Sequence, residues 1–96
     1  MRKNTARVLA AWRAGKDDRR DRSVWTDGRT VYSYATAILA IANDGMPIVN
    51  VTRYSNTTTN LQNGMRYWLD LHGRVHREVT NIPRGVSDVT LANTKG

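Results

Sequence analysis

The sequence predicts an α+β fold, with an N-terminal helix, a three- or four-stranded antiparallel sheet and one amphipathic helix packed on one face of the sheet. Two runs rich in β-branched and aromatic residues flank Asp27-Gly28, a typical turn of a β-hairpin. A third run with strand-like alternation starts at Pro47, and apolar residues then recur at helical spacing from Leu61 to His72. The chain of 96 residues is long enough for one domain with a modest core.

Charge and hydrophobicity divide the chain into segments of different character. These are an N-terminal helix (1–15), a basic linker (16–22), a body of sheet plus helix (23–82) and a tail that is flexible or ordered by a partner (83–96). In the first segment Val8, Leu9 and Trp12 share one helical face, and Asn4 or Thr5 is the expected cap. Because so short a helix is marginal in water, we expect Trp12 to dock on the body.

The body opens with strands expected at residues 23–26 and 30–34. Residues 35–42 are apolar and fit either a strand or a buried helical turn, and the flanking strands favour the strand. After a turn at Asn43-Asp44-Gly45 the next strand is expected at residues 47–54, in an antiparallel meander. We expect residues 74–82 to add an edge strand, and residues 87–91 a strand that depends on a partner.

The long helix has the clearest signal of all the elements. The run Thr59-Asn60-Leu61-Gln62 matches a capping box, in which the Thr hydroxyl and the Gln side chain satisfy each other's backbone donors, so the helix should begin at Thr59. The stripe that should cover the sheet consists of Leu61, Met65, Trp68, Leu69 and His72, with Gly73 as the stop.

Positive charge is concentrated near the N-terminus. The net charge is +7, of which residues 1–22 supply +5, from eight basic and three acidic side chains. A basic arm before a nearly neutral body suits contact with a polyanion, although a basic surface also keeps a small protein in solution. The arm residues expected to contact phosphates are Arg2, Lys3, Arg7, Arg13, Arg19, Arg20 and Arg22.

The junction between the third strand run and the long helix is a second candidate site. Helix starts carry unpaired N–H groups and the positive end of the helix dipole, and they therefore attract anions. Capping accounts for one or two polar residues here, whereas seven of the eight residues from Thr52 to Thr59 are polar. The expected contact residues are Arg53, Tyr54, Asn56, Thr57 and Thr58, with Asn50 and Asn60 in reach of base edges or sugar oxygens.

Two other motifs have ordinary explanations. Trp25, Tyr32 and Tyr34 could stack on bases, but aromatic strand residues more often pack across strands. His72 and His76 have the spacing of two metal ligands on a helix, but the glycine between them ends the helix. We therefore expect no metal site and no cofactor.

The sequence does not predict an enzyme. The acidic residues are scattered, and the chain has neither a Gly-rich phosphate loop nor a nucleophile elbow. Cysteine is absent, which excludes disulfides and thiolate chemistry. The N-terminus lacks the apolar segment of a signal peptide, and no run has membrane-spanning length, so we expect an intracellular protein that does not enter the membrane.

A resemblance to a known group rests on three segments. Trp12 near Gly15, the run 26–34 (TDGRTVYSY) and the run 54–59 (YSNTTT) resemble small proteins of unknown function encoded by bacteriophages of actinobacteria, in which a TDG…LYSY segment precedes a YS.TT segment just before a helix. The resemblance covers about residues 8–70. Related members carry His-Gln after the Thr pair, where this chain has Asn60-Leu61-Gln62, so no role for that His is transferred. The resemblance implies a viral origin and the host cytoplasm, without an activity.

Together these observations predict a small non-catalytic protein that binds nucleic acid, with DNA favoured over RNA, through the basic arm and the helix-start junction. The alternative is a protein-interaction module that engages or inhibits a host protein through an exposed apolar patch and a tail ordered on binding. A homodimer formed through an open sheet edge at 74–82 or 87–91 is a further alternative, because so small a sheet leaves edges unpaired.

Overall fold

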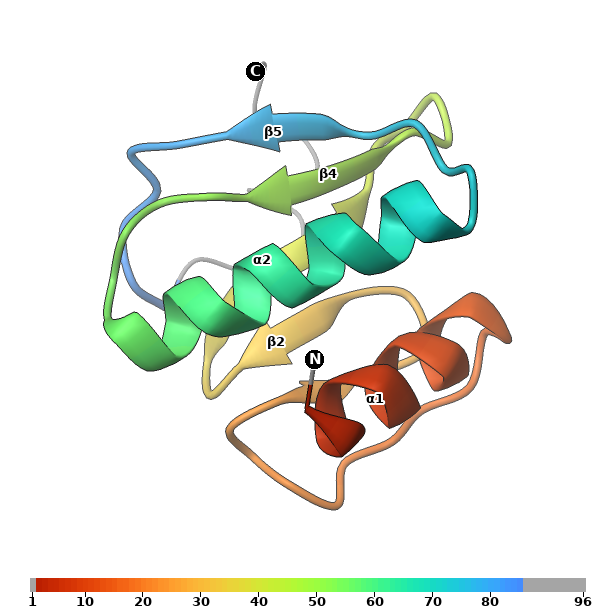
Figure 1. The fold of residues 1–96 in the computed structure, drawn as a ribbon, viewed down its shortest axis with the longest axis horizontal. Coiled ribbons are helices and arrows are strands. Elements are labelled where there is room, and N and C mark those ends of the chain that lie inside the picture. Colours follow the sequence, from red (N-terminus) through yellow and green to blue (C-terminus); the bar gives the residue numbers. More distant parts are fainter. Residues whose placement is uncertain (1, 86–96) are drawn as a thin grey trace.

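The computed structural model describes residues 2–85 as two helices and five strands (Figure 1). In chain order these are α1 (Lys3–Arg13), β1 (Trp25–Thr26), β2 (Val31–Ser33), β3 (Thr36–Ile41), β4 (Pro47–Asn50), α2 (Asn56–Leu71) and β5 (Arg77–Val79). The fold class is α+β, as the sequence predicts. The strand expected at 87–91, and most of the tail expected at 83–96, lie outside the described residues.

The strands form one sheet in the order β1-β2-β3-β4-β5. The first four are antiparallel neighbours, which confirms the meander, and the turn at Asn43-Asp44-Gly45 joins β3 to β4. The edge strand expected at 74–82 is present as β5, but it runs parallel to β4. The sheet is therefore mixed and five-stranded among the described residues, which corrects the expected three- or four-stranded antiparallel sheet. Because α2 carries the chain back along the sheet, the next strand enters in the direction of β4.

Strand β3 resolves the ambiguity of residues 35–42 in favour of the strand. It lies in the middle of the sheet, and its residues from Ala37 to Ala40 are buried on both faces, which explains a run without polar alternation. Val31 pairs with Leu39 and Tyr32 with Ala37, so Ile38 is an extra residue in β3, a β-bulge. The bulge allows both Ile38 and Leu39 to join the core on the helix side.

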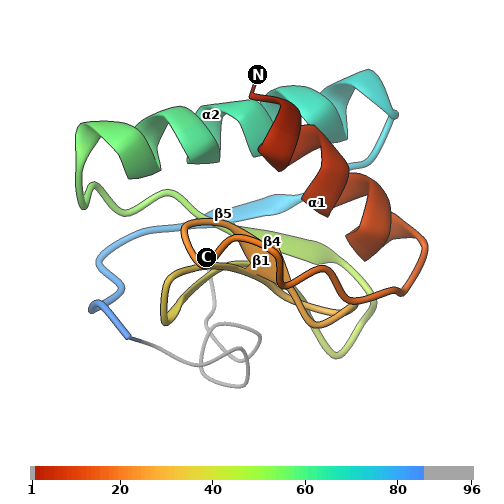
Figure 2. The same cartoon turned by 90° about the horizontal axis from the view of Figure 1, so that it is seen from below.

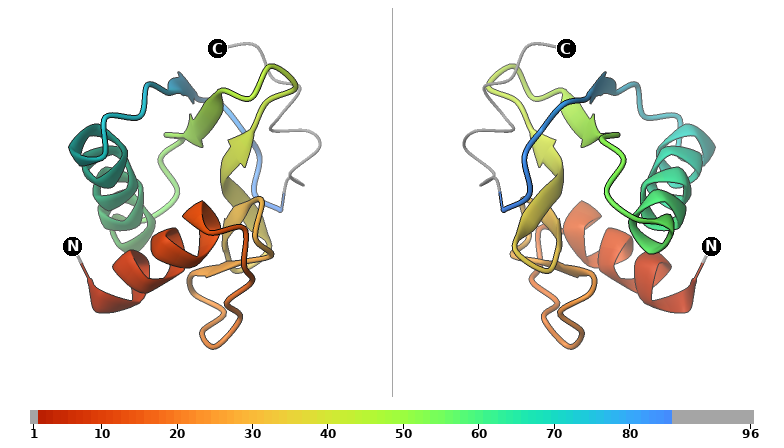
Figure 3. Two further views of the ribbon diagram at one scale, coloured as in Figure 1. Left: turned by 90° about the vertical axis from the view of Figure 1, so that its right-hand side faces the viewer. Right: turned by 90° about the vertical axis from the view of Figure 1, so that its left-hand side faces the viewer.

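Both helices cover the same face of the sheet, as Figures 2 and 3 show. The core between the layers contains residues from both helices and from the sheet: Val8, Leu9, Trp12, Val24, Val31, Ile38, Leu39, Val49, Met65, Trp68 and Leu69. A second buried cluster comprises Ala37, Ala40, Ala42, Ile48, Val79 and Ile82. Leu61, Met65, Trp68 and Leu69 of the expected stripe pack in the first core, whereas His72 is exposed. Within residues 2–85 neither helix combines the length and apolar composition that crossing a membrane requires.

Helix α1 docks through Trp12, as expected. The Trp12 indole is buried, lies edge-on to Trp68 at a centroid distance of 6.2 Å, and donates from Nε1 to the Arg29 carbonyl oxygen at 2.7 Å. The start of the helix differs from the expectation, because its N-cap is Arg2, which makes no side-chain capping bond. The structure instead buries Thr5 on the inner side of α1.

The linker expected at 16–22 is packed against the body rather than simply solvated. Asp18 exchanges two backbone hydrogen bonds with Thr26, of 2.9 and 3.0 Å, and its side chain is buried. Arg7 of α1 donates from Nε to the Asp18 carboxylate at 2.8 Å. Burial alone raises the pKa of Asp18, but hydrogen bonds from Arg7 and from the Arg20 backbone outweigh it and hold that pKa below its ordinary value. The N-terminal helix, linker and body therefore form one unit.

Candidate nucleic-acid interface

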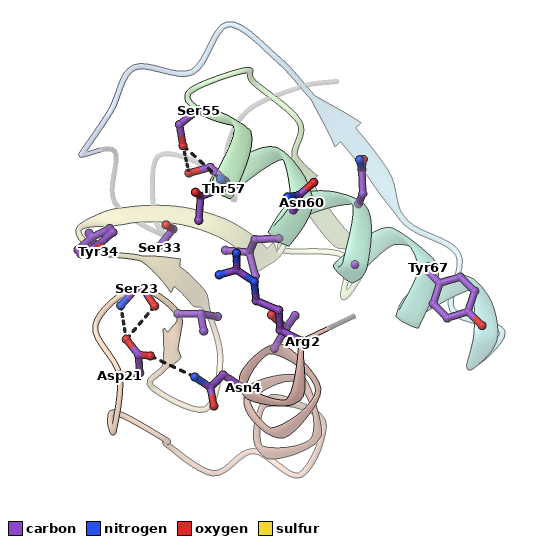
Figure 4. Close-up of a pocket in the computed structure, with 16 residues that line it drawn as sticks. Arg2, Asn4, Asp21, Ser23, Ser33, Tyr34, Ser55, Thr57, Asn60 and Tyr67 are labelled. Carbon is purple, nitrogen blue, oxygen red and sulfur yellow. Dashed lines mark hydrogen bonds between the residues drawn. The ribbon is translucent and has the colours of Figure 1, made fainter.

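A cleft of about 880 Å³ opens between the N-terminal end of α1, the first half of α2 and the loop residues around Asp21 and Tyr34 (Figure 4). Among residues 2–85, its lining is mainly hydroxyl and amide side chains, with one arginine, Arg2, and one acid, Asp21. Two tyrosines, Tyr34 and Tyr67, lie at opposite ends of the cleft in Figure 4. Segments that lie far apart in the sequence, from Arg2 to Tyr67, thus contribute to one concave surface.

One wall of the cleft is the start of α2, which differs from the sequence prediction. The helix begins at Asn56, and the N-cap is Ser55, whose Oγ accepts from the Thr58 N–H at 3.2 Å. The first turn contains no acidic residue, and the N–H groups of Asn56 and Thr57 have no hydrogen-bond partner among residues 2–85. The positive end of the helix dipole is therefore uncompensated and lies at the cleft.

The prediction of a capping box between Thr59 and Gln62 is wrong. The Gln62 side chain is buried and donates from Nε2 to the carbonyl oxygens of Asn50 and Thr52, at 2.7 and 2.8 Å. These bonds tie the inner side of α2 to the last residue of β4 and to the segment that follows it. Both backbone carbonyl groups are satisfied in this way, which accounts for the burial of a polar side chain on α2.

Two residues considered as ligand contacts serve the fold instead. Asn50 is buried, and its Nδ2 donates to the Ala37 carbonyl at 3.2 Å and to the Tyr54 hydroxyl at 2.9 Å. The Tyr54 hydroxyl donates in turn to the Ile82 carbonyl at 2.6 Å. Asn50 and Tyr54 thus anchor the segment between β4 and α2, and neither lines the main cleft.

Two hydroxyl groups in the cleft have no partner among the described residues. Thr5 of α1 is 4% exposed and Ser33 of β2 is 9% exposed, and both line the cleft. Neither side chain makes a hydrogen bond within residues 2–85, but neither hydroxyl oxygen is among the buried unpaired polar atoms of those residues, which are Thr30 Oγ1 and Arg77 Nε. Figure 4 places Ser33 on the side of the cleft between Thr57 and Ser23.

Arg2 is the basic residue of the expected arm that lines the cleft. In Figure 4 its side chain extends from the start of α1 into the space between α1 and α2. The Arg2 guanidinium makes no ion pair or hydrogen bond among residues 2–85, whereas the Arg7 guanidinium is paired with the Asp18 carboxylate. A partnerless guanidinium in a polar cleft is available to an anionic ligand.

The carboxylate of Asp21, which lines the cleft, accepts hydrogen bonds from neighbouring donors. It accepts from the Ser23 N–H at 2.9 Å, from the Ser23 hydroxyl at 2.8 Å and from Asn4 Nδ2 at 3.2 Å. The backbone N–H of Ser23 is the main cause that holds the pKa of Asp21 below its ordinary value. These bonds fix the loop against α1, and they spread the carboxylate charge over local donors.

The remaining expected arm residues are dispersed. Arg13 contacts His72, Arg20 lies 3.8 Å from the Asp18 carboxylate, and Arg19 pairs with Asp17 and lies over the Trp25 ring. Of the twelve expected contact residues, the structure brings three into the main cleft, which are Arg2, Thr57 and Thr58. The other nine do not line the main cleft; they are Lys3, Arg7, Arg13, Arg19, Arg20, Arg22, Arg53, Tyr54 and Asn56.

A smaller hollow of about 120 Å³ adjoins the main cleft and shares Ser33, Tyr34, Ser55 and Thr58 with it. It is lined on its far side by Arg84, which donates from Nη2 to the Tyr54 carbonyl at 3.1 Å and lies over the Tyr54 ring. The two hollows together place a guanidinium on either side of the start of α2. No local sequence pattern links Arg84 to this site, because its contact depends on a residue 30 positions earlier.

Trp25 and Tyr32 pack across strands, as expected, and stack between β1 and β2 with a centroid distance of 4.2 Å. Tyr34 departs from the expected strand, because it lies in the turn after β2 with a positive φ of 54° and is 64% exposed. His76 contacts Glu78 at 3.1 Å. Among residues 2–85 no group of three potential metal ligands is present.

Comparison with known proteins gives no match: no family model fits the chain, and no curated protein or solved structure is significantly similar to it.

Proposed function

We propose that the protein binds nucleic acid, without catalysis, through the cleft between α1 and the start of α2. The observation that carries this proposal is the position of Arg2. The basic arm folds back as α1, so its first arginine lines the same cleft as Thr57 and Thr58 of the helix start. A guanidinium and an uncompensated helix start are both suited to phosphate oxygens.

The surroundings of the cleft also support this proposal. Lys3 and Arg22 are exposed and are neighbours in the sequence of residues that line the cleft. Tyr34 and Tyr67 are 64% and 61% exposed and line the cleft, and exposed tyrosines stack on unpaired bases. Phosphate contact at the centre with stacking at the ends favours a single strand, with DNA ahead of RNA.

Fluorescence anisotropy with labelled single-stranded DNA, duplex DNA and single-stranded RNA tests this proposal. We expect binding at low salt that weakens steeply as salt rises, because counterions are released from the phosphates. Arg2→Gln should weaken binding more than the control Arg29→Gln, which removes one charge from an exposed residue outside the cleft. Equal effects of the two variants would argue against the cleft, and no binding to any probe at low salt would refute the proposal.

A second candidate function is interaction with a protein, such as a host factor or another copy of this chain. It is favoured by Leu71 and Val75, which are 65% and 75% exposed at the end of α2 away from the cleft. Exposed apolar side chains that cluster often mark a contact surface. Light scattering of the wild type and of Leu71→Ser tests self-association: a dimer in the wild type that the variant abolishes would support this function, and two monomers would exclude the homodimer.

A further inference from the structure

Both helices end on the same side of the molecule, as Figure 1 shows. Three aromatic rings lie in a row at these ends. The centroid of the Trp12 ring of α1 lies 6.2 Å from that of the Trp68 ring of α2, which in turn lies 4.2 Å from that of the His72 ring. Both tryptophans are buried, whereas His72 is exposed. The rings therefore form a fixed support for the side chains that contact them.

An arginine contacts each end of this row. The Arg74 guanidinium carbon lies 5.1 Å from the centroid of the Trp12 ring, and Arg13 donates from Nη1 to His72 Nδ1 at 3.1 Å. A guanidinium has five N–H donors, so contact with a ring leaves most of them available to a ligand. A histidine that accepts at Nδ1 carries its proton on Nε2, which gives the exposed His72 a donor as well. Both guanidinium groups are thus held by rings and not by carboxylates.

Basic side chains near the end of a helix often satisfy its last carbonyl groups, but these arginines do not. The carbonyls near the end of α1 accept from the backbone N–H groups of residues 14–16, and those near the end of α2 accept from residues 72–74. The two helix dipoles together place about one negative charge at these ends. Against it stand the three positive charges of Arg13, Arg74 and Lys16, which is exposed in the segment after α1. Helix capping therefore does not account for the cations.

The helix-end surface, which we define as Arg13, Lys16, His72 and Arg74, has no counter-charge among residues 2–85. Asp70, the acid nearest to His72 in the sequence, forms no ion pair in that part of the chain. The basic residues that do form ion pairs there are Arg7, Arg19, Arg20, Arg66, His76 and Arg77. Because its positive charge is unbalanced, the helix-end surface attracts anions.

We propose that the helix-end surface binds the sugar-phosphate backbone of a nucleic acid, in addition to the cleft that Arg2 lines. This inference rests on the proposed function and deepens it. Arg2 and Arg13 lie at opposite ends of α1, a helix of 11 residues and about 16 Å, so one strand can contact both. A strand carries a phosphate on every nucleotide, which suits cations at both ends of a helix better than an isolated carboxylate does. Phosphate contacts read no sequence, so this surface adds affinity without base preference.

Arg13→Gln and Arg74→Gln test the proposal, with fluorescence anisotropy of labelled single-stranded DNA measured at several salt concentrations. Each lost phosphate contact should weaken binding about fivefold at about 0.1 M salt. It should also reduce the slope of log K against log salt by about 0.7. The matched control is Arg53→Gln, because Arg53 is exposed and lies before the start of α2, at the opposite end of that helix. The control should change affinity less than twofold.

Arg13→Lys and Arg74→Lys separate the charge of each side chain from its packing. A lysine keeps the positive charge but lacks the planar group that stacks on a ring. If the arginines contact phosphates, the lysine variants should recover the salt slope of the wild type, and all four variants should melt close to the wild type. Lower melting temperatures without recovery of the slope would assign these arginines to packing alone and overturn the proposal.

The inference and the proposed function can fail separately. If Arg2→Gln weakens binding but Arg13→Gln and Arg74→Gln bind DNA as Arg53→Gln does, the helix-end surface is refuted and the cleft stands. If the Arg13 and Arg74 variants weaken binding but Arg2→Gln does not, the helix-end surface stands and the cleft is refuted. Polyglutamate of the same charge identifies the other class of partner. If it binds as tightly as DNA and loses as much affinity in these variants, the surface recognises acidic protein and the proposal is overturned.

Discussion

The indole of Trp12 donates a hydrogen bond of 2.7 Å to the backbone carbonyl oxygen of Arg29, which joins α1 to the turn between β1 and β2. The same turn contacts the end of α1 at Gly28, where a Cβ atom would lie 2.8 Å from the Gly15 carbonyl oxygen. These contacts hold a short helix that would be marginal by itself. Because α1 is held, its N-cap residue Arg2 stays in the lining of the cleft.

Trp12→Phe should lower the free energy of unfolding by about 1–2 kcal/mol, since it keeps an aromatic ring but leaves the Arg29 carbonyl without its donor. Urea denaturation followed by circular dichroism measures this change. Trp68→Phe is the matched control, because Trp68 is also buried in the core but its indole N–H makes no hydrogen bond within residues 2–85. If Trp12→Phe lowers the free energy of unfolding no more than Trp68→Phe does, the hydrogen bond between Trp12 and Arg29 contributes nothing to stability.

Gly28→Ala should destabilise the protein more than Gly45→Ala. Both glycines have positive φ, of 95° and 83°, so both alanines are strained by roughly 1 kcal/mol or more. A Cβ at Gly28 also meets the backbone of Gly15, whereas the space around Gly45 is open. Melting temperatures of the two variants compare them directly, and equal shifts would mean that the turn moves away from α1 without cost.

Thr57→Glu should raise stability and weaken anion binding at once. A carboxylate in the first turn of α2 complements the helix dipole, typically by about 0.3–1 kcal/mol, and it places negative charge in the cleft. Thr80→Glu adds the same charge outside the cleft and serves as the control. Thermal unfolding and anisotropy on the same samples measure both effects. If Thr57→Glu binds oligonucleotides as well as Thr80→Glu does, the start of α2 is not a contact.

Asp18→Asn should destabilise the protein at neutral pH but not in acid. The pKa of Asp18 is below its ordinary value in the folded state, so the ionised carboxylate stabilises the fold above the unfolded pKa of about 4. This contribution is lost as the pH falls through the lower folded pKa. The difference in melting temperature between wild type and Asp18→Asn should therefore shrink from pH 7 to pH 3. If the difference in melting temperature stays the same from pH 7 to pH 3, the destabilisation by Asp18→Asn comes from altered packing and not from loss of the ion pair with Arg7.

Most element types could be predicted from local pattern, whereas some boundaries could not. Asp27-Gly28 marks the hairpin turn and Gly73 has the positive φ that ends α2. The start of α2 was missed because Ser55, Asn56 and the three threonines are all acceptable caps. The choice of Ser55 follows from the anchoring of Tyr54 to Ile82, a contact 28 residues away.

The sequence by itself determined the type and order of most elements, because periodicity, β-branching and glycine positions act over a few neighbouring residues. It did not determine the start of α2 or the conformation of residues 35–42. Only the tertiary structure decided that β5 runs parallel to β4, that the linker buries Asp18, and that Arg2, Ser33 and Thr57 meet in one cleft. These outcomes depend on contacts between distant segments. The burial and hydrogen bonding that stabilise these contacts exist only once the helices pack on the sheet. No local pattern of residues therefore predicts these contacts.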